Sequence, residues 1–475
     1  MQIITNSKRI IDARRTVVEL LLADHKLKCL SCERADDCRL KKVATKLRAD
    51  KTKFTQDKEL TDNESDSSYI NRDMSKCINC GRCIRVCKRF QQVGVLGTDG
   101  RGFASKVGCA FGKGLNTTKC ISCGQCVANC PTGALIEISD LDTLKSKLSD
   151  PDIHCIVATA PSTRVAIGEG FGLPAGTNAQ GKMVAALKKL GFAKVFDLDL
   201  AADLTIMEEG AELLTRLKTG KNLPQFTSCC PAWINYVERI HTELIPNIST
   251  AKSPMGMFAA IAKTYYAKKV AINPKNIYMV MLMPCIAKMS EIVRDDIKDV
   301  DMILTTRTAI RFIKEQGIDF INLKSEKYDD PLSLSSGAGL IFGTTGGLAE
   351  AALRTISDKL PRKINTVVIS GIANAEKIIQ DIKNGKANYD FIEIMACEGG
   401  CVNGGGQPSH MGEIQDNRGN GRIRAKTIYK MDKYNSIRKS SDNPAIKQLY
   451  DEFLGHPNSE LAHELLHTKF KTKKD

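Results

Sequence analysis

The chain has 475 residues, 42% of them hydrophobic, which is enough for two to four globular domains. Its formal charge of +15 comes from basic residues spread along the chain, without a zinc-finger, helix-turn-helix or basic–aromatic pattern, so we expect no nucleic-acid partner. No apolar run approaches the roughly 18 residues of a membrane span, and the N-terminus has no secretory signal. With 18 cysteines, these features predict a cytoplasmic protein in a reducing compartment.

The first predicted element is a helix over about 13–25, which runs into a metal-binding pattern. His25, Cys29, Cys32 and Cys38 follow with the spacing H-x3-C-x2-C-x5-C. Three thiols and one imidazole make a four-coordinate set, which suits either a zinc ion or a 4Fe–4S cluster with one histidine ligand. The two cluster motifs that follow favour an electron-relay cluster over a structural zinc.

Residues 51–68 are charged and rich in Ser and Asp, so we expect a linker. After it come two cysteine quartets with the spacing C-x2-C-x2-C-x3-C. In two-cluster bacterial ferredoxins, three close cysteines of such a run bind one 4Fe–4S cube and the fourth reaches the other. Zinc knuckles and disulfides are the alternatives. We expect one cluster on Cys77, Cys80, Cys83 and Cys130, and a second on Cys120, Cys123, Cys126 and Cys87.

From about residue 152, short apolar runs alternate with amphipathic stretches. This alternation predicts an α/β fold with a largely parallel sheet, whose site lies at the carboxyl ends of the strands. The last 50 residues look helical, and the Gly-rich segments 168–172 and 343–347 fit no phosphate-binding motif, so we expect tight turns there. Strands are expected over 154–159, 193–198, 276–283, 300–304, 365–370 and 389–395, and helices over 181–190, 202–218, 254–268, 306–316 and 373–384.

Three further segments carry cysteines: TSCCPAW (227–233), MPCIAK (283–288) and EIMACEGGCVNGGGQP (393–408). The second and third follow apolar strand candidates, and the first follows a shorter extended stretch. Their thiols can therefore converge at one end of the sheets. The four that suffice for one more 4Fe–4S cube are Cys230, Cys285, Cys397 and Cys401.

Cys229 is left over, because two adjacent cysteines rarely bind the same cube. A thiol held beside a metal centre can take and release protons. Lys288 offers a fixed cation to an anionic ligand, and the glycines at 399–400 and 404–406 let the backbone approach a bulky group. These residues indicate a redox cluster with a proton relay and an anion clamp. The alternative is a structural cluster with a spare thiol.

The three segments resemble the signature segments of the FeFe-hydrogenases, and the resemblance covers almost the whole chain. It implies a two-lobed α/β catalytic domain over 146–475, with mostly parallel sheets flanked by helices. A ferredoxin-like domain with two 4Fe–4S clusters (69–145) and a small cluster domain plus linker (1–68) precede it. It also implies an H-cluster, in which a 4Fe–4S cube is bridged to a two-iron unit carrying carbon monoxide, cyanide and a dithiolate, beside three accessory 4Fe–4S clusters.

The resemblance assigns roles to individual residues. Cys401 matches the ligand that bridges the cube and the two-iron unit, and Cys229 matches the thiol that passes protons to that unit. Lys288 matches the residue that hydrogen-bonds one cyanide, while Pro161 and Ser162 match the loop that contacts the other. The apolar wall around the two-iron unit is matched by Met283, Phe342 and Met395.

The family's proton path runs through carboxylates, a serine and an arginine, matched here by Glu209, Glu212, Ser249 and Arg216. Glu209, Glu212 and Arg216 share the spacing i, i+3, i+7 and therefore one face of a helix. Without the resemblance, an ordinary salt-bridged helix face would be the preferred interpretation.

The resemblance implies reversible dihydrogen oxidation and proton reduction, with the accessory clusters relaying electrons to ferredoxin or to iron–sulfur partner subunits. The chain begins just before the His25 module, without the 2Fe–2S domain of larger family members. Such shortened forms are ferredoxin-linked enzymes or subunits of assemblies, among them a hydrogen-dependent carbon dioxide reductase with a formate dehydrogenase. Maturation enzymes are the remaining expected partners. A hydrogenase-like iron–sulfur assembly protein or a sensory protein is the alternative function, which the full third segment and Cys229 disfavour.

Overall fold

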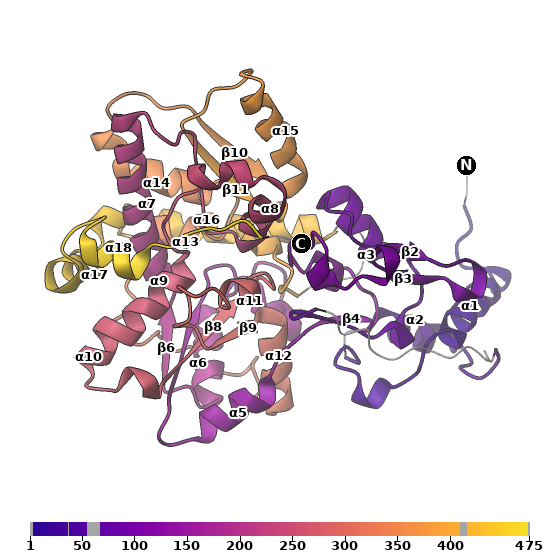
Figure 1. Cartoon of the computed structure of the whole chain (residues 1–475). Helices are drawn as coiled ribbons and strands as arrows, with labels where there is room; N and C mark the ends of the chain where they lie inside the picture. The colour runs from indigo at the N-terminus through magenta and orange to yellow at the C-terminus, as the bar shows by residue number, and fades with distance from the viewer. Residues whose placement is uncertain (1–2, 37, 55–66, 409–415, 474–475) are drawn as a thin grey trace. The chain divides into compact units, whose positions relative to one another are not determined.

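The computed structural model describes residues 3–36, 38–54, 67–408 and 416–473. Most of the predicted linker therefore lies outside the described residues. The chain forms two compact units, the first made of Met1–Cys120 with Gln125–Ile138 and the second of Ile121–Gly124 with Ser139–Asp475 (Figure 1). The domain boundaries expected from the sequence remain predictions.

The first unit begins with two helices, α1 (Lys8–Ala23) and α2 (Arg39–Leu47). The Ser7 hydroxyl accepts a hydrogen bond from the Ile10 amide at 3.4 Å, so α1 begins several residues before the predicted helix. Val18 and Leu22 of α1 pack with Cys38 and Leu40 in a small apolar cluster. Cys38, a member of the first metal-binding pattern, is therefore packed against apolar side chains of both helices.

The rest of the first unit is built from short elements around the two cysteine quartets. Both strand pairs, β1 with β4 and β2 with β3, are antiparallel. Gly81 has φ 66° at the start of α3, which lets the chain turn tightly between Cys80 and Cys83. The elements are β1 (Ile70–Arg72), α3 (Arg82–Arg85), β2 (Gly97–Asp99), β3 (Lys106–Gly108), α4 (Gln125–Ala128) and β4 (Leu135–Glu137).

The second unit contains two parallel sheets, which confirms the α/β prediction (Figure 1). The first sheet has the order β6-β5-β8-β9 and the second has the order β10-β11-β7. The two inner strands of the first sheet, β5 and β8, are almost continuously apolar, as expected for strands that are covered on both faces. The strands are β5 (His154–Thr159), β6 (Lys194–Asp197), β7 (Gln225–Phe226), β8 (Ile277–Met283), β9 (Met302–Thr305), β10 (Thr366–Ser370) and β11 (Phe391–Met395).

Helices flank both sheets, and the longest, α7, packs against α9, α13 and α14. Residues 343–347 lie in the turn that leads into α14, whereas 168–172 do not form a simple turn, because Ile167–Phe171 is a 3-10 helix. The helices before the C-terminal segment are α5 (Leu141–Ser149), α6 (Gln180–Lys189), α7 (Asp199–Thr219), α8 (Pro231–Ile240), α9 (Pro254–Ile261), α10 (Ala267–Lys269), α11 (Lys288–Glu291), α12 (Thr306–Glu315), α13 (Gly337–Ile341), α14 (Gly347–Ile356) and α15 (Ile372–Lys383).

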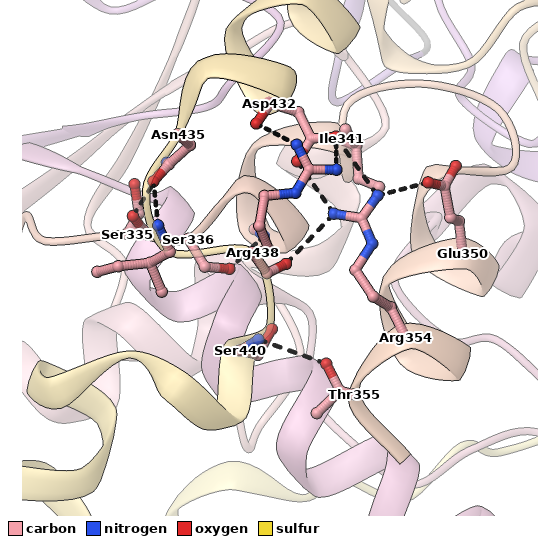
Figure 2. A network of polar contacts seen from close by, with 12 residues as sticks. Ser335, Ser336, Ile341, Glu350, Arg354, Thr355, Asp432, Asn435, Arg438 and Ser440 are labelled. Atoms are coloured by element: carbon pink, nitrogen blue, oxygen red, sulfur yellow. Dashed lines mark hydrogen bonds and ion pairs between the residues drawn. The ribbon is translucent and has the colours of Figure 1, made fainter. Parts of the chain in front are cut away.

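The C-terminal segment is helical, as predicted, with α16 (Asp416–Tyr434), α17 (Pro444–Leu449) and α18 (Glu460–Leu466). A charged network anchors it to α14 (Figure 2). Arg354 of α14 donates to Asp432 of α16 at 3.0 Å and also pairs with Glu350. Arg438 pairs with the same Asp432 side chain at 3.0 Å. Within the described ranges, no helix has the length and apolar character needed to cross a membrane.

Candidate active site

A cavity lies at the carboxyl ends of strands from both sheets of the second unit. Pro161 and Ser162 reach it from the end of β5, and Cys285 reaches it from the end of β8. Cys230 follows β7, and the segment after β11 supplies Cys397 and Cys401. The topology therefore brings together all three cysteine segments, as the sequence predicted, because parallel strands end at the same edge of a sheet.

The thiols in this cavity lie close enough to influence one another. Burial, followed by the charge of Cys230, raises the pKa of Cys285 to about 12. Burial also raises the pKa of Cys401, with further contributions from Cys230 and Cys285. Cys397 lines the same wall. A group that supplies positive charge stabilises such thiolates, so the donor set fits an iron–sulfur cube.

Gly400 and Gly404 line the cavity, where the lack of a side chain lets neighbouring backbone segments approach closely. A Cβ at Gly400, which has φ 90°, would lie 2.5 Å from the Thr345 nitrogen, and a Cβ at Gly404 would lie 2.3 Å from the Pro284 carbonyl oxygen. The Ser162 hydroxyl is fully buried at the cavity and has no hydrogen-bond partner among the described residues. It is therefore a donor available to a polar ligand, as the predicted contact with a cyanide requires.

Lys288 is a buried cation at the cavity wall, only 6% exposed. Its Nζ donates to Glu291 Oε2 at 2.6 Å, to Ser253 Oγ at 2.7 Å and to the Cys229 carbonyl at 3.3 Å. Burial acts to lower the pKa of Lys288, but the charge and hydrogen bond of Glu291, together with the charges of Cys229 and Cys285, outweigh burial and the pKa is raised. Lys288 is therefore a fixed positive charge, as predicted.

Cys229, the residue before the cube ligand Cys230, also lines the cavity and is 7% exposed. Burial raises its pKa well above the ordinary value, and the charge of Glu209 raises it further. Cys229 therefore lines the cavity and lies close enough to Glu209 for their charges to interact. These surroundings favour the protonated thiol over the thiolate.

Glu209 lies on α7 and is 1% exposed. Neither carboxylate oxygen has a hydrogen-bond partner among the described residues. Burial raises its pKa well above the ordinary value, and the charges of Glu212 and Glu393 add to this effect. A carboxyl group in these surroundings favours its protonated form more than an exposed carboxyl does, which suits a proton-transfer group.

Glu212, one turn further along α7, connects this buried region to the surface. Its Oε2 accepts from the Ser249 hydroxyl at 2.7 Å, and its Oε1 accepts from Arg216 Nη2 at 2.7 Å. Arg216 is held in turn by the carbonyl oxygens of Asn222 and Asn247. Glu212 and Arg216 line an open surface pocket. All four predicted members of the proton path therefore lie in one region, and the ion pair of the alternative interpretation is present within it.

In the first unit, Cys77, Cys80, Cys83 and Cys130 line one small cavity. Burial and the charges of the other three thiols raise the pKa of Cys83 to about 12. This is the crossed arrangement expected for the first ferredoxin-type cluster. Burial likewise raises the pKa of Cys126, with contributions from Cys120 and Cys87 of the second predicted set. Its remaining member, Cys123, belongs to the second unit.

The His25 module also assembles in the first unit. His25 Nδ1 is buried and has no hydrogen-bond partner among the described residues, which suits a metal ligand. Burial raises the pKa of Cys38, and the nearby Cys32 and Cys29 contribute. Across the described ranges, no group of three or more His, Cys, Asp and Glu side chains is arranged to hold a single metal ion.

Sequence reasoning missed one glycine and assigned a different role to another. A Cβ at Gly133 would lie 2.7 Å from Cys32 Sγ, so this glycine makes room for a sulfur of the His25 module. Gly405 was interpreted as room for a bulky group, but a Cβ there would lie 2.2 Å from the Cys123 carbonyl oxygen, within the second unit. The only signal in the sequence was their position beside Cys130 and Cys401.

Comparisons with known proteins agree with this geometry. Residues 153–405 match the family described as iron only hydrogenase large subunit, C-terminal domain. The chain belongs to the FeFe-hydrogenase family. Residues 421–473 match the iron hydrogenase small subunit, 76–134 match a 4Fe–4S dicluster domain, and 14–53 match the iron–sulfur binding region of NADH-ubiquinone oxidoreductase-G.

This FeFe-hydrogenase is 42% identical to the NADP-reducing hydrogenase subunit HndD of Solidesulfovibrio fructosivorans, over 99% of this chain and 86% of that protein. It is 38% identical to iron hydrogenase 1 of Clostridium pasteurianum, over 99% of this chain and 88% of that protein. A solved structure of the FeFe-hydrogenase of Chlamydomonas reinhardtii is similar with a TM-score of 0.62 and 36% identity, covering 70% of this chain and 99% of that one.

The FeFe-hydrogenase therefore acts on dihydrogen at an H-cluster and carries three accessory 4Fe–4S clusters as an electron relay. The match over residues 14–53 favours a 4Fe–4S cluster in the His25 module, where the spacing alone also allowed zinc.

Proposed function

We propose that this FeFe-hydrogenase interconverts dihydrogen with two protons and two electrons in both directions, and exchanges those electrons with a ferredoxin or an iron–sulfur partner subunit. The observation that carries the proposal is the cavity in which four thiols, the Lys288 cation and the Cys229 thiol meet. When bound, the H-cluster supplies the chemistry of H–H bond formation and cleavage, and the chain supplies orientation, charge and proton transfer.

The residues around the cavity have separate roles in this proposal. Cys230, Cys285, Cys397 and Cys401 would hold the cube, with Cys401 as the ligand shared with the two-iron unit. Lys288 would place its positive charge, and Ser162 its hydroxyl donor, beside polar ligands of that unit, and Pro161 would shape the loop that carries Ser162. Met283, Phe342 and Met395 line the cavity with apolar surface, which would exclude water and strengthen these interactions.

Protons travel between the cavity and the surface along α7. In the direction of dihydrogen oxidation, the Cys229 thiol gives its proton to Glu209 and regains one from the cavity. The raised pKa of Glu209 lets this carboxyl accept and hold the proton. The Ser249 hydroxyl, 2.7 Å from Glu212, passes it on, while Arg216 holds the Glu212 carboxylate in place. Production of dihydrogen uses the same groups in reverse.

When bound, the accessory clusters would relay electrons to and from the cube. The accessory ligands in the proposal are His25, Cys29, Cys32 and Cys38 for one cluster, Cys77, Cys80, Cys83 and Cys130 for another, and Cys87, Cys120, Cys123 and Cys126 for the third.

The proposed partners are of two kinds. A relative named as a subunit of an NADP-reducing hydrogenase supports iron–sulfur partner subunits, and a formate dehydrogenase is the further candidate within such an assembly. Maturation enzymes, the second kind, would deliver the two-iron unit.

The many thiols support a cytoplasmic location for the protein. One relative, 43% identical over 57% of this chain and 73% of its own length, is named a periplasmic hydrogenase large subunit.

The test is dihydrogen evolution from reduced viologen by anaerobically matured protein, beside Cys229→Ala. We expect strong activity that falls by roughly 10²–10⁴ in the variant, the usual contribution of a proton-transfer group. Cys155→Ala is the matched control, because Cys155 is buried in β5 away from the cavity lining and its loss should leave the activity intact.

An inactive wild-type protein with intact accessory clusters, lacking the two-iron unit despite working maturation enzymes, would contradict the proposal. That outcome would favour an iron–sulfur assembly role. Cytosolic iron–sulfur assembly component 3 of Rattus norvegicus is 28% identical over 66% of this chain and 74% of its own length.

A further inference from the structure

Two histidines of the C-terminal segment stack beside the surface end of the predicted proton path. His463 and His467 are one turn apart at the end of α18, with ring centroids 4.0 Å apart and an interplanar angle of 24°. His463 is exposed and lines the open pocket that Glu212 and Arg216 also line. His467 is buried behind it.

Hydrogen bonds fix the inner histidine on both sides. His467 Nδ1 lies 2.8 Å from the Thr250 hydroxyl, and its Nε2 lies 3.1 Å from Glu208 Oε2. The Thr250 amide in turn donates to Glu212 Oε2 at 2.9 Å. Glu208 also accepts from the Tyr450 hydroxyl, so this carboxylate is firmly held. The imidazole pair is therefore built onto the same backbone segment that positions Glu212.

The outermost carboxyl of the proposed path is Glu212, whose two oxygens already accept from Arg216, the Ser249 hydroxyl and the Thr250 amide. Arg216 has only donors to offer and keeps its protons, as guanidinium groups do in proteins. It therefore holds Glu212 and does not carry protons onward. An imidazole changes its protonation within the physiological range, which suits exchange with bulk water.

We propose that His463 is the outer proton-exchange group of the path, and that His467 is a positioning residue that holds its ring. This inference rests on the proposed function of Glu212. In dihydrogen oxidation, a Glu212 carboxyl proton passes through pocket water to the His463 imidazole, and the imidazolium releases it to solvent. Proton reduction uses the same transfers in reverse, and the step moves one proton without any redox change.

The charges around His463 set its proton affinity. Burial and the neighbouring His467 lower its pKa, while Glu208 and Glu212 act to raise it. With its pKa lowered, the His463 imidazolium releases a proton more readily than an ordinary imidazolium does. The other charged groups lining the pockets next to His463 are Arg216, Lys221, Glu238, Arg294, Asp295, Asp296, Glu464, Lys469, Lys471 and Lys473.

The test compares His463→Gln with the wild type in dihydrogen oxidation at low buffer concentration. We expect a loss on the order of tenfold, smaller than the roughly 10²–10⁴ of a buried proton-transfer group because His463 is exposed to solvent, and recovery when imidazole is added to the medium. His456→Gln is the matched control, because the His456 ring lies 3.0 Å from the Pro457 carbonyl and lines neither pocket. Unchanged rate, pH profile and buffer dependence in His463→Gln would overturn the proposal.

A second measurement is independent of catalytic turnover. The pKa of His463 is followed by NMR in the wild type and in Glu212→Gln, whose loss of negative charge should lower that pKa. Absence of any shift would overturn the coupling between the two groups even if the protein were inactive. His467→Gln should shift the same resonance and cause a smaller loss of rate that imidazole also restores.

Discussion

Glu209 and Glu291 are both buried near the catalytic cavity, 1% and 5% exposed, yet their surroundings differ. Glu291 pairs with Lys288 at 2.6 Å and accepts a hydrogen bond from Ser253. Glu209 has no hydrogen-bond partner among the described residues, and burial raises its pKa. A compensating cation thus decides whether a buried carboxylate holds charge or exchanges protons.

The strongest test of this contrast is Glu209→Gln. The amide has the same shape but cannot accept a proton, so we expect activity to fall by roughly 10²–10⁴. The free energy of unfolding should change little, because no ion pair or hydrogen bond within the described residues is lost. Viologen-linked dihydrogen evolution and urea unfolding measure the two effects.

The exposed acid Glu315 of α12 provides the control for that variant, since Glu315→Gln should leave the rate unchanged. If Glu209→Gln kept wild-type activity, protons would have to leave by another route.

Lys288→Met tests the other half of the comparison, the ion pair between Lys288 and Glu291. Removing the cation leaves the buried Glu291 uncompensated, and breaking such a pair costs about 3–5 kcal/mol of unfolding free energy. The double variant Lys288→Met with Glu291→Met should recover most of this loss without recovering activity. Urea unfolding of the three proteins measures the coupling, and a double variant no more stable than the single one would refute the pairing.

Glu393 predicts a pH dependence of stability. Burial raises its pKa to about 7, although the Ala349 and Gly346 amides act to lower it. The folded protein then binds a proton that the unfolded chain, with an ordinary carboxyl pKa, releases. The stabilisation, about 3 kcal/mol, is fully present below the unfolded pKa of about 4.5 and is lost as the pH rises through about 7.

Glu393→Gln should flatten this decline while leaving other titrations in place. Unfolding free energies of both proteins between about pH 5 and 8 provide the measurement. A wild-type profile that stays level across this range would show that Glu393 is already ionised in the folded state.

The sequence predicted most strands of the second unit because their apolar runs are continuous. The expected strand over 154–159 coincides with β5, and 276–283 contains β8. In contrast, β7 has only two residues and α13 is rich in glycine, so neither carries a recognisable periodicity. Both are stabilised by tertiary packing, which no local pattern reports.

The candidate site was predictable where ligand spacing is local and unpredictable where distant segments meet. Glu208 and Glu209 are neighbours in the sequence and look equivalent. In the fold, Glu208 is held by Tyr450 and His467 from the C-terminal segment, whereas Glu209 is left without such partners among the described residues. The difference between the two carboxyl groups therefore depends on the tertiary contacts of the C-terminal segment, which the local sequence does not show.

Thr250 and His467 are 217 positions apart, and Thr250 also donates its amide hydrogen bond to Glu212 of the proposed proton path. We expect a contact across so long a loop to form late, because closing the loop costs entropy before packing compensates for it. Cys229 and Glu209 lie much closer along the chain and can meet earlier. The order of folding would therefore assemble the inner part of the path first and complete its connection with solvent last.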